Sequence, residues 1–332
     1  LEAVYYAACG SSFRGNSDGE LIKWNADGGS ISLGFSRLEV ANQLDFAFRR
    51  DKRRTIVYNG QKIPLRELIG AFNVVLFAPD DLLLIKGAPA GRRKFLDMEI
   101  SQASPAYYRE LITYNRLLQQ RNSLLKEIRE GKSKAGMLEF WNPQLAASAA
   151  KITAKRLEAV QKFNMLANLM QRRISGNEEN LSLSYQIKGM ENGQLAENME
   201  IWYNEMLHGL NNEEIYRGVT CVGPHRDDII VSVNGINLKS FGSQGQQRTA
   251  VLSMKLSELE FIRSETGEYP VLLLDDVMSE LDAGRRQQLL NFIEREGIQT
   301  LITATDEAYF QQAPLKTYFQ VEAGQVKVVN KV

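Results

Sequence analysis

Two adjacent carboxylates, Asp275 and Asp276, directly follow the four apolar residues Val271 to Leu274. An uninterrupted apolar run is typical of a strand buried on both faces, and open α/β sheets bind ligands at the carboxyl ends of such strands. This pattern indicates a Walker B strand, in which Asp275 would hold Mg²⁺ and Asp276 would polarise the water that attacks a γ-phosphate. The residues alone also allow a buried strand that ends in a solvated acidic turn.

A Ser-x-Gly-Gln turn formed by Ser243, Gly245 and Gln246 precedes this strand and opens an apolar-periodic segment from Ala250 to Ile262. At the amino end of a helix, a serine hydroxyl and free backbone N–H groups attract an anion, and phosphate is the obvious candidate. Taken alone, the turn is more often an ordinary helix start with a serine N-cap. Followed by the helix, the acidic strand and a Ser-x-Leu-Asp segment ending at Asp282, it indicates nucleotide chemistry.

A helix and a second strand are expected after the acidic strand. The segment from Asp282 to Glu296 has a helical apolar period, and Gln299 to Thr303 form the next strand-like run. A strand, a helix and a strand in this order form a crossover that makes the two strands parallel. Thr303 therefore ends beside the acidic pair, where either Thr303 or Thr305 is a candidate sensor of the γ-phosphate.

A turn between two strand-like segments carries five cations and one aspartate, a local net charge of +4. Its cations are Arg49, Arg50, Lys52, Arg53 and Arg54. Several cations in one turn can follow a nucleic-acid backbone, and each phosphate contact makes binding more salt-dependent. The alternative is a solvated hairpin turn whose charges protect an edge strand from pairing.

The amino-acid composition excludes or disfavours several other classes of protein. The 332 residues are 44% hydrophobic, enough for a sizeable core, and 40 basic residues balance 40 acidic ones, so no global charge indicates nucleic-acid binding. Two cysteines and two histidines make a disulfide framework, a histidine-based metal site and a Ser-His-Asp triad improbable. With no signal-like or membrane-spanning apolar run, we expect a cytoplasmic protein without a membrane partner.

The elements that must position these residues fall into three regions, 1–104, 105–211 and 212–332. In the first region, apolar and polar residues alternate from Ile31 to Ile63, which predicts an antiparallel sheet with a hairpin at Asn59-Gly60. A strand at Asn73 to Phe77 and a short helix at Asp80 to Lys86 are expected to follow. In the third, a hairpin from Ile229 to Leu238 leads into the Ser-x-Gly-Gln turn.

The middle region reads as helical. Apolar residues step by three and four from Tyr107 to Ile128, where Arg121 is the polar exception, and again from Leu145 to Met170. A polar link at 130–136 joins them, which indicates either an antiparallel helical hairpin projecting from the core or ordinary amphipathic helices of a globular lobe. A strand is possible at Leu181 to Ile187.

The order of these motifs resembles the carboxyl half of an ABC-type ATPase, and further segments resemble the RecF family of bacterial DNA replication and repair proteins. These segments are Pro79 to Asp97, Gly223 to Asp228 and Leu281 to Arg285. The resemblance implies an α/β fold: an ABC-type ATPase core with an antiparallel β subdomain and an all-helical insertion lobe. Within the first segment, Arg92 to Lys94 would either form an internal ion pair or contact a phosphate across a dimer.

The resemblance also implies a function. Two ATP molecules, each with Mg²⁺, would join a head-to-tail homodimer, in which Ser243, Gly245 and Gln246 of one subunit close over phosphates held by the other, near Asp282. Hydrolysis would release the dimer from DNA. The family acts in DNA damage repair and the SOS response. It recognises gapped or single-strand/duplex junction DNA and, with partners of the RecO and RecR type, helps load the RecA recombinase. Aspartate at 276, where many relatives have glutamate, implies slow hydrolysis.

No G-x-x-x-x-G-K-[ST] motif occurs in the chain, and Gly131-Lys132-Ser133 lacks the first glycine and the strand-to-helix setting. Ser11 to Arg14 resemble the segment after the family's phosphate-binding loop, so we expect the chain to begin just after that loop, with roughly 35 to 40 residues before it missing. Whether the chain is an enzyme stays open. The alternatives are a Rad50-like or SMC-like ATPase, a DNA-binding scaffold without nucleotide chemistry, and a transporter subunit, which the absence of a histidine near Thr303 disfavours.

Overall fold

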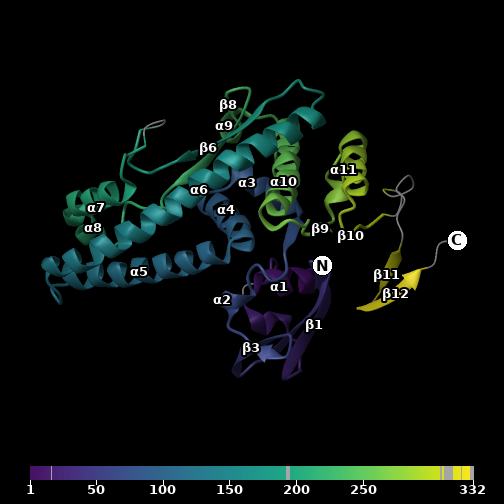
Figure 1. The fold of residues 1–332 in the computed structure, drawn as a ribbon, viewed down its shortest axis with the longest axis horizontal. Helices are drawn as coiled ribbons and strands as arrows, with labels where there is room; N and C mark the ends of the chain where they lie inside the picture. Colours follow the sequence, from purple (N-terminus) through teal and green to yellow (C-terminus); the bar gives the residue numbers. More distant parts are fainter. Residues whose placement is uncertain (16, 192–194, 307–308, 310–316, 323, 330–332) are drawn as a thin grey trace.

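The computed structural model describes residues 1–15, 17–191, 195–306, 309, 317–322 and 324–329. A small parallel sheet lies near the centre, an antiparallel lobe lies below it, and a pair of long helices extends to one side (Figure 1). Within the described part of the chain, no helix is both long enough and apolar enough to cross a membrane.

The parallel sheet places β9 (Val271–Asp275) between β5 (Val74–Phe77) and β10 (Thr300–Thr303). Leu272 to Leu274 of β9 are at most 2% exposed, as expected for a strand covered on both faces. The crossover from β9 to β10 runs through the short helix η4 (Val277–Ser279) and α11 (Ala283–Glu296). The predicted parallel order is therefore confirmed, and Thr303 pairs in register with Asp275.

The amino-terminal lobe is the predicted antiparallel sheet, covered by α1 (Glu2–Cys9). Its strands are β1 (Gly28–Arg37), β2 (Val40–Arg49), β3 (Lys52–Tyr58) and β4 (Gln61–Lys62), with η1 (Asp18–Leu21) and α2 (Leu65–Leu68) beside them. Tyr6 of α1 is fully buried and packs edge-on against Phe46 and Phe48 of β2. Asn59 and Gly60 both have positive φ, which confirms the predicted hairpin between β3 and β4.

The helical region contains the predicted antiparallel pair, α5 (Pro105–Arg129) and α6 (Leu138–Ile174). The two helices lie side by side at the end of the molecule far from the parallel sheet, and α6 continues back to pack against α10 (Gln244–Thr266) (Figure 1). The region therefore combines a hairpin with an ordinary packed lobe. The region also contains η3 (Ala135–Met137) and α7 (Met199–Gly209). Before it lie η2 (Pro79–Leu82), α3 (Leu83–Lys86) and α4 (Pro89–Ala103), and α8 (Asn211–Arg217) follows at its end.

A third sheet crosses the predicted boundary at residue 211. The possible strand is present as β6 (Leu181–Gln186), and it pairs antiparallel with β7 (Asp228–Val233), which in turn pairs with β8 (Ile236–Asn237) ahead of α9 (Leu238–Phe241). The middle region is consequently not all helical, and it shares hydrogen bonds with the third region. A separate hairpin, β11 (Tyr318–Glu322) and β12 (Gln325–Val329), follows the core and was not predicted.

Arg121, the polar exception in α5, is fully buried with its partners. Its guanidinium forms an ion pair with Glu214 of α8, with 2.7 Å between Nη2 and Oε2. It also donates to Asn142 Oδ1 and Thr220 Oγ1 at 2.9 and 2.8 Å. Glu214 Oε1 accepts the Cys221 N–H at 2.6 Å. The arginine therefore ties α5, α6 and α8 together through one polar network inside the helical lobe.

A second buried polar cluster joins α10 to α4. Lys255 Nζ lies 3.0 Å from Glu258 Oε1 and 3.5 Å from Asp81 Oδ1, and Glu99 of α4 is buried beside this group. One ammonium therefore faces three carboxyls. Burial, offset in part by Lys255, raises the pKa of Glu99 to about 7, and burial likewise raises the pKa of Glu258.

Glu99→Gln should stabilise the protein more at high pH than at low pH. The pKa of Glu99 is higher in the folded protein than in the unfolded chain. The carboxyl group therefore contributes most to stability below its pKa in the unfolded chain. This stability is lost as the pH rises through the folded-state pKa of about 7. Urea denaturation should give the variant an advantage of roughly 1 to 3 kcal/mol at about pH 8 and little at about pH 5. The exposed control Glu205→Gln should show no such trend, and a pH-independent difference for Glu99→Gln would contradict the argument.

Candidate nucleotide-binding site

The two predicted carboxylate residues meet Thr303 at the carboxyl end of the parallel sheet. Asp275 ends β9 and is 8% exposed, and its Oδ1 accepts the Thr303 hydroxyl at 2.9 Å. The Asp276 N–H donates to the same hydroxyl oxygen at 3.1 Å. Thr303 thus bridges Asp275 and Asp276 from the neighbouring strand. The structure brings the three residues together as predicted, whereas their chemical roles stay predictions.

Asp276 has a left-handed backbone, with φ of 54°. This conformation is uncommon for a residue with a side chain and often accompanies functional turns. Ser279 Oγ donates to the Asp276 carbonyl at 2.8 Å and holds the turn closed. Asp276 Oδ1 is buried and has no hydrogen-bond partner among the described residues. A carboxylate oxygen in this state fits a site whose partner is a bound water or ligand.

Arg14 is a site residue that the sequence analysis did not single out. Its guanidinium forms an ion pair with Asp275 Oδ2, although most of the Arg14 side chain is exposed. The guanidinium therefore places a positive charge on the carboxylate that was predicted to hold Mg²⁺. Arg14 follows α1, and no local pattern marks it as the partner of a residue at the other end of the chain.

The donor set suits Mg²⁺ bound together with phosphates. Among the described residues, no group of three or more Asp, Glu, His or Cys side chains could hold a metal on its own. Mg²⁺ in nucleotide sites is typically held by one or two carboxylates, with phosphate oxygens and waters as the other ligands. The Asp275 carboxylate, together with the Asp276 Oδ1 that has no hydrogen-bond partner among the described residues, matches a site with one or two carboxylate ligands.

The Ser-x-Gly-Gln turn is a capped helix start on the protein surface. Ser243 Oγ accepts the Gln246 N–H at 3.2 Å, and Gln246 Oε1 accepts the Ser243 N–H at 3.1 Å, a reciprocal capping box. Gln246 Nε2 also donates to Glu179 Oε1 at 3.1 Å. The N-cap interpretation is therefore confirmed. Ser243 is exposed, so the turn is also accessible to a second molecule.

Asp282 caps α11 and lies in the same surface region as this turn. Its Oδ1 accepts the Arg285 N–H at 2.9 Å, and its carboxylate forms an ion pair with the Arg285 guanidinium. Arg285 also donates to Thr249 Oγ1 and to the Gly245 carbonyl of α10. Arg285 thus connects the start of α11 to the start of α10.

The patch from Arg92 to Lys94 is largely internal. Arg92 is 4% exposed and donates to both carboxylate oxygens of Asp228, at 2.7 and 2.9 Å. Arg93 donates to the Asp227 carbonyl at 2.7 Å, and Lys94 is exposed. The internal ion-pair alternative is correct for Arg92. Two of the segments that carry the family resemblance are therefore direct partners in the fold.

Two cations of the basic turn have structural partners, and the other three lie at the exposed hairpin tip. Arg54 donates to the Tyr6 hydroxyl, the Gly10 carbonyl and Asp18, and it ties the sheet to α1 and η1. Arg50 donates to the carbonyls of 26 and 23, at 2.9 and 3.2 Å. Both side chains thus brace neighbouring loops. The other three cations, Arg49, Lys52 and Arg53, are exposed around the tip of the β2–β3 hairpin.

The sequence of the chain is similar to those of known proteins. The chain is 46% identical over 310 residues to the DNA replication and repair protein RecF of Halothermothrix orenii, a match that covers 92% of this chain and 82% of that protein. The RecF protein of Alkaliphilus oremlandii is 42% identical over 313 residues, covering 92% and 83%. The chain belongs to the RecF family. The chain matches no family model.

Solved RecF structures share the whole architecture. Two are described as the recombination mediator protein RecF in the RecFOR pathway, in forms named RecF-ATPrS and RecF-ATP. They are 34% and 35% identical to this chain, with TM-scores of 0.91 and 0.89, and each match covers 99% of this chain and 88% of that one. An Smc head bound to the C-winged helix domain of ScpA matches at a TM-score of 0.51 and 15% identity, over 99% of this chain and 84% of that one, a likeness of fold alone.

Proposed function

We propose that this RecF-family chain acts as an ATPase that binds DNA at gaps or single-strand/duplex junctions. It closes on ATP as a head-to-tail dimer and helps load the RecA recombinase with partners of the RecO and RecR type. The observation that carries the proposal is the Thr303 bridge between Asp275 and Asp276, with Arg14 beside it. Relatives described with ATP and in the RecFOR pathway support it.

Each residue of the site has a distinct task in this proposal. Asp275 would hold Mg²⁺, which would neutralise phosphate charge when ATP is bound. Asp276 orients a water molecule, because its buried Oδ1 has capacity for a hydrogen bond that no described residue fills. Thr303 fixes the Asp275 carboxylate and the Asp276 backbone. Arg14 exchanges its carboxylate partner for a phosphate oxygen, an interaction that its planar guanidinium suits.

The dimer surface in this proposal is the exposed region around the starts of α10 and α11. Ser243, Gly245 and Gln246 would close over the phosphates of a second copy, because a helix amino terminus favours an anion. Asp282 would lie at the edge of the same surface. The link through Arg285 keeps the two helix starts together as this surface meets its partner.

DNA binding is tested by reversing two exposed cations of the basic turn. Arg49→Glu/Arg53→Glu should weaken binding of a gapped oligonucleotide about tenfold and lower the salt slope by about 2, because duplex phosphate contacts each contribute about 0.9. Fluorescence anisotropy at several salt concentrations measures both quantities. The control is Arg172→Glu/Arg173→Glu, which makes the same charge change at the carboxyl end of α6. Equal losses in the two double variants would move the DNA contact away from the turn.

The same assay separates nucleotide chemistry from a DNA-binding scaffold. With the family's phosphate-binding loop fused before Leu1, ATP and Mg²⁺ should strengthen binding of gapped DNA. Asp275→Asn should remove this nucleotide effect and leave the basal binding unchanged. If ATP has no effect on the wild-type fusion, the ATPase part of the proposal is wrong and the scaffold alternative is correct.

A further inference from the structure

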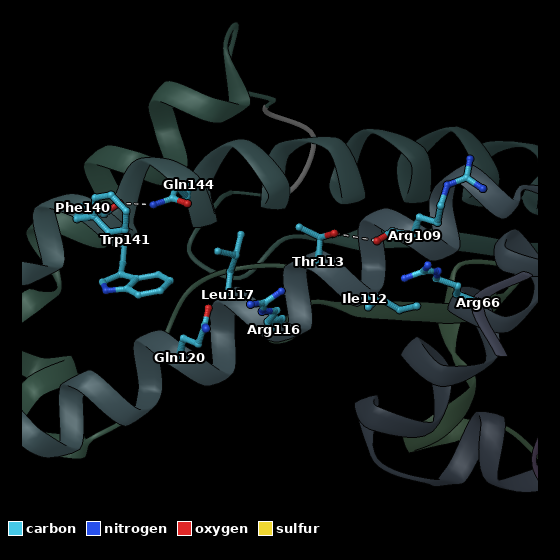
Figure 2. A pocket seen from close by; sticks show the side chains of 10 residues that line it. All are labelled: Arg66, Arg109, Ile112, Thr113, Arg116, Leu117, Gln120, Phe140, Trp141 and Gln144. Atoms are coloured by element: carbon cyan, nitrogen blue, oxygen red, sulfur yellow. Dashed lines mark hydrogen bonds between the residues drawn. The ribbon is translucent and has the colours of Figure 1, made fainter. Parts of the chain in front are cut away.

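A basic and aromatic groove lies on the helical lobe, away from the parallel sheet. It has a volume of about 610 Å³ and is formed by α5, the start of α6 and Arg66 of α2. Figure 2 shows Trp141 and Phe140 at one end, Arg109 and Arg66 at the other, and Arg116 between them. Of the described residues that line the groove, three are arginines and none is acidic. The groove therefore suits an anionic partner.

The three arginines are available to such a partner. Neither Arg109 nor Arg116 has an ion-pair partner among the described residues, and Arg66 faces only Glu67, at 3.9 Å, where both side chains are more than half exposed. Exposed pairs of this kind are weak and readily exchanged. Arg116 follows Arg109 by seven positions, so both project from the same face of α5, about 10 Å apart along the helix axis.

The aromatic end of the groove is fixed in place. Trp141 packs against the buried cluster of Leu124, Leu125 and Leu138, and its ring meets Phe140 edge-on with 5.4 Å between centroids. Phe140 is 68% exposed, so its ring is accessible to a partner. Two rings held beside a row of cations offer stacking surfaces next to phosphate contacts.

We propose that this groove binds the single-stranded arm of gapped or junction DNA, an inference that rests on the proposed function. Unpaired bases present flat faces that stack on Trp141 and Phe140, while Arg109, Arg116 and Arg66 contact the backbone phosphates. Duplex DNA keeps its bases stacked internally and gains only the phosphate contacts. The groove should consequently discriminate in favour of single strands, whereas the basic turn should contact both forms.

The test compares two double charge reversals and one ring deletion. Fluorescence anisotropy is measured with single-stranded oligothymidine and with a duplex of the same length. Arg109→Glu/Arg116→Glu should weaken single-strand binding at least about tenfold and lower the salt slope by about 1.4, since each single-strand phosphate contact contributes about 0.7. Trp141→Ala should cost about tenfold for the single strand and little for the duplex. Arg172→Glu/Arg173→Glu, about 45 Å away along α6, should match wild type.

A spectroscopic readout keeps the test independent of folding losses. In Trp24→Phe/Trp202→Phe, Trp141 is the remaining tryptophan. Its emission should be quenched by oligothymidine at the concentrations at which anisotropy rises. If this variant binds oligothymidine without any change in Trp141 emission, or if Trp141→Ala weakens duplex and single strand equally, the groove is not the single-strand site. If the wild type binds neither DNA, the proposed function itself is wrong.

Discussion

Asp276→Asn should trap a dimer on DNA when the family's phosphate-binding loop precedes Leu1 and ATP and Mg²⁺ are present. Asparagine keeps the shape of the side chain and the backbone bond to Thr303, so nucleotide binding should change little. In the proposed mechanism it removes the charge that orients the attacking water, and loss of such a group lowers the rate by about a hundredfold or more. The substitution should therefore affect the transition state more than the ground state.

Ser243→Arg should have the opposite effect on assembly. Each subunit would still bind ATP through its own loop and Asp275, but a long cation at the exposed helix start would obstruct closure over the partner's phosphates. Loss of the serine also breaks the capping box with Gln246. Ser243→Ala is the matched control, because it removes the same cap without adding bulk and should cost about 1 kcal/mol of stability.

Size-exclusion chromatography with ATP and Mg²⁺ distinguishes the two cases. A larger species should appear for Asp276→Asn and should be absent for Ser243→Arg. ATP hydrolysis measured on the same samples should be lost in Asp276→Asn. Should Asp276→Asn and Ser243→Arg both bind ATP and elute as monomers, the head-to-tail dimer is the wrong mechanism for this protein.

Arg121→Met should destabilise the protein by about 3 to 5 kcal/mol, because it leaves the Glu214 carboxylate buried without its cation. The unfolding free energy from urea denaturation measures this loss. The exposed control Arg129→Met, on the same helix, should lie within about 0.5 kcal/mol of wild type. Since α5, α6 and α8 all contribute to the network, the helical lobe should unfold at lower denaturant concentration than in the control.

The double variant Arg121→Met/Glu214→Leu should recover much of the lost stability, because no buried charge then remains unpaired. Recovery should be incomplete. The Cys221 N–H, which donates to Glu214, and the oxygens of Asn142 and Thr220 would lack their present partners. A double variant as unstable as Arg121→Met would show that side-chain packing, and not the charge, gives Arg121 its importance.

Periodic segments were predictable from the sequence, whereas long-range partners were not. The buried strand ending at Asp275, the parallel neighbour ending at Thr303 and the helical pair follow from apolar patterns that span single elements. The pairing of β6 with β7 joins two segments that are far apart, and no local period encodes which edge accepts which strand. The domain boundary at residue 211, which was predicted from helix content, therefore separates two strands that pair in one sheet.

The partners of the cations at the candidate sites were likewise not predictable from the sequence. A cluster such as Arg49 to Arg54 predicts positive charge, but the sequence does not show that Arg54 faces Tyr6 and Asp18 while Arg53 faces solvent. Arg14, a single arginine after α1, gave no signal of this ion pair, because its acidic partner lies 261 positions away. The motif residues were found because the motifs have a fixed local spacing, whereas these ion pairs join residues at no fixed spacing.

The position of β9 between β5 and β10 has a consequence for synthesis of the chain. Phe77 ends β5 and Val271 begins β9, so 271 − 77 = 194 positions separate the strands that pair in register. At about 5 to 20 residues per second, β5 leaves the ribosome roughly 10 to 40 seconds before its partner. During that interval, the apolar strand Val74 to Phe77 lacks the one neighbour with which it pairs among the described residues. Unpaired apolar strands favour aggregation. Early packing of α4, whose Gln102 side chain accepts the Val74 N–H, would shield the strand during this interval.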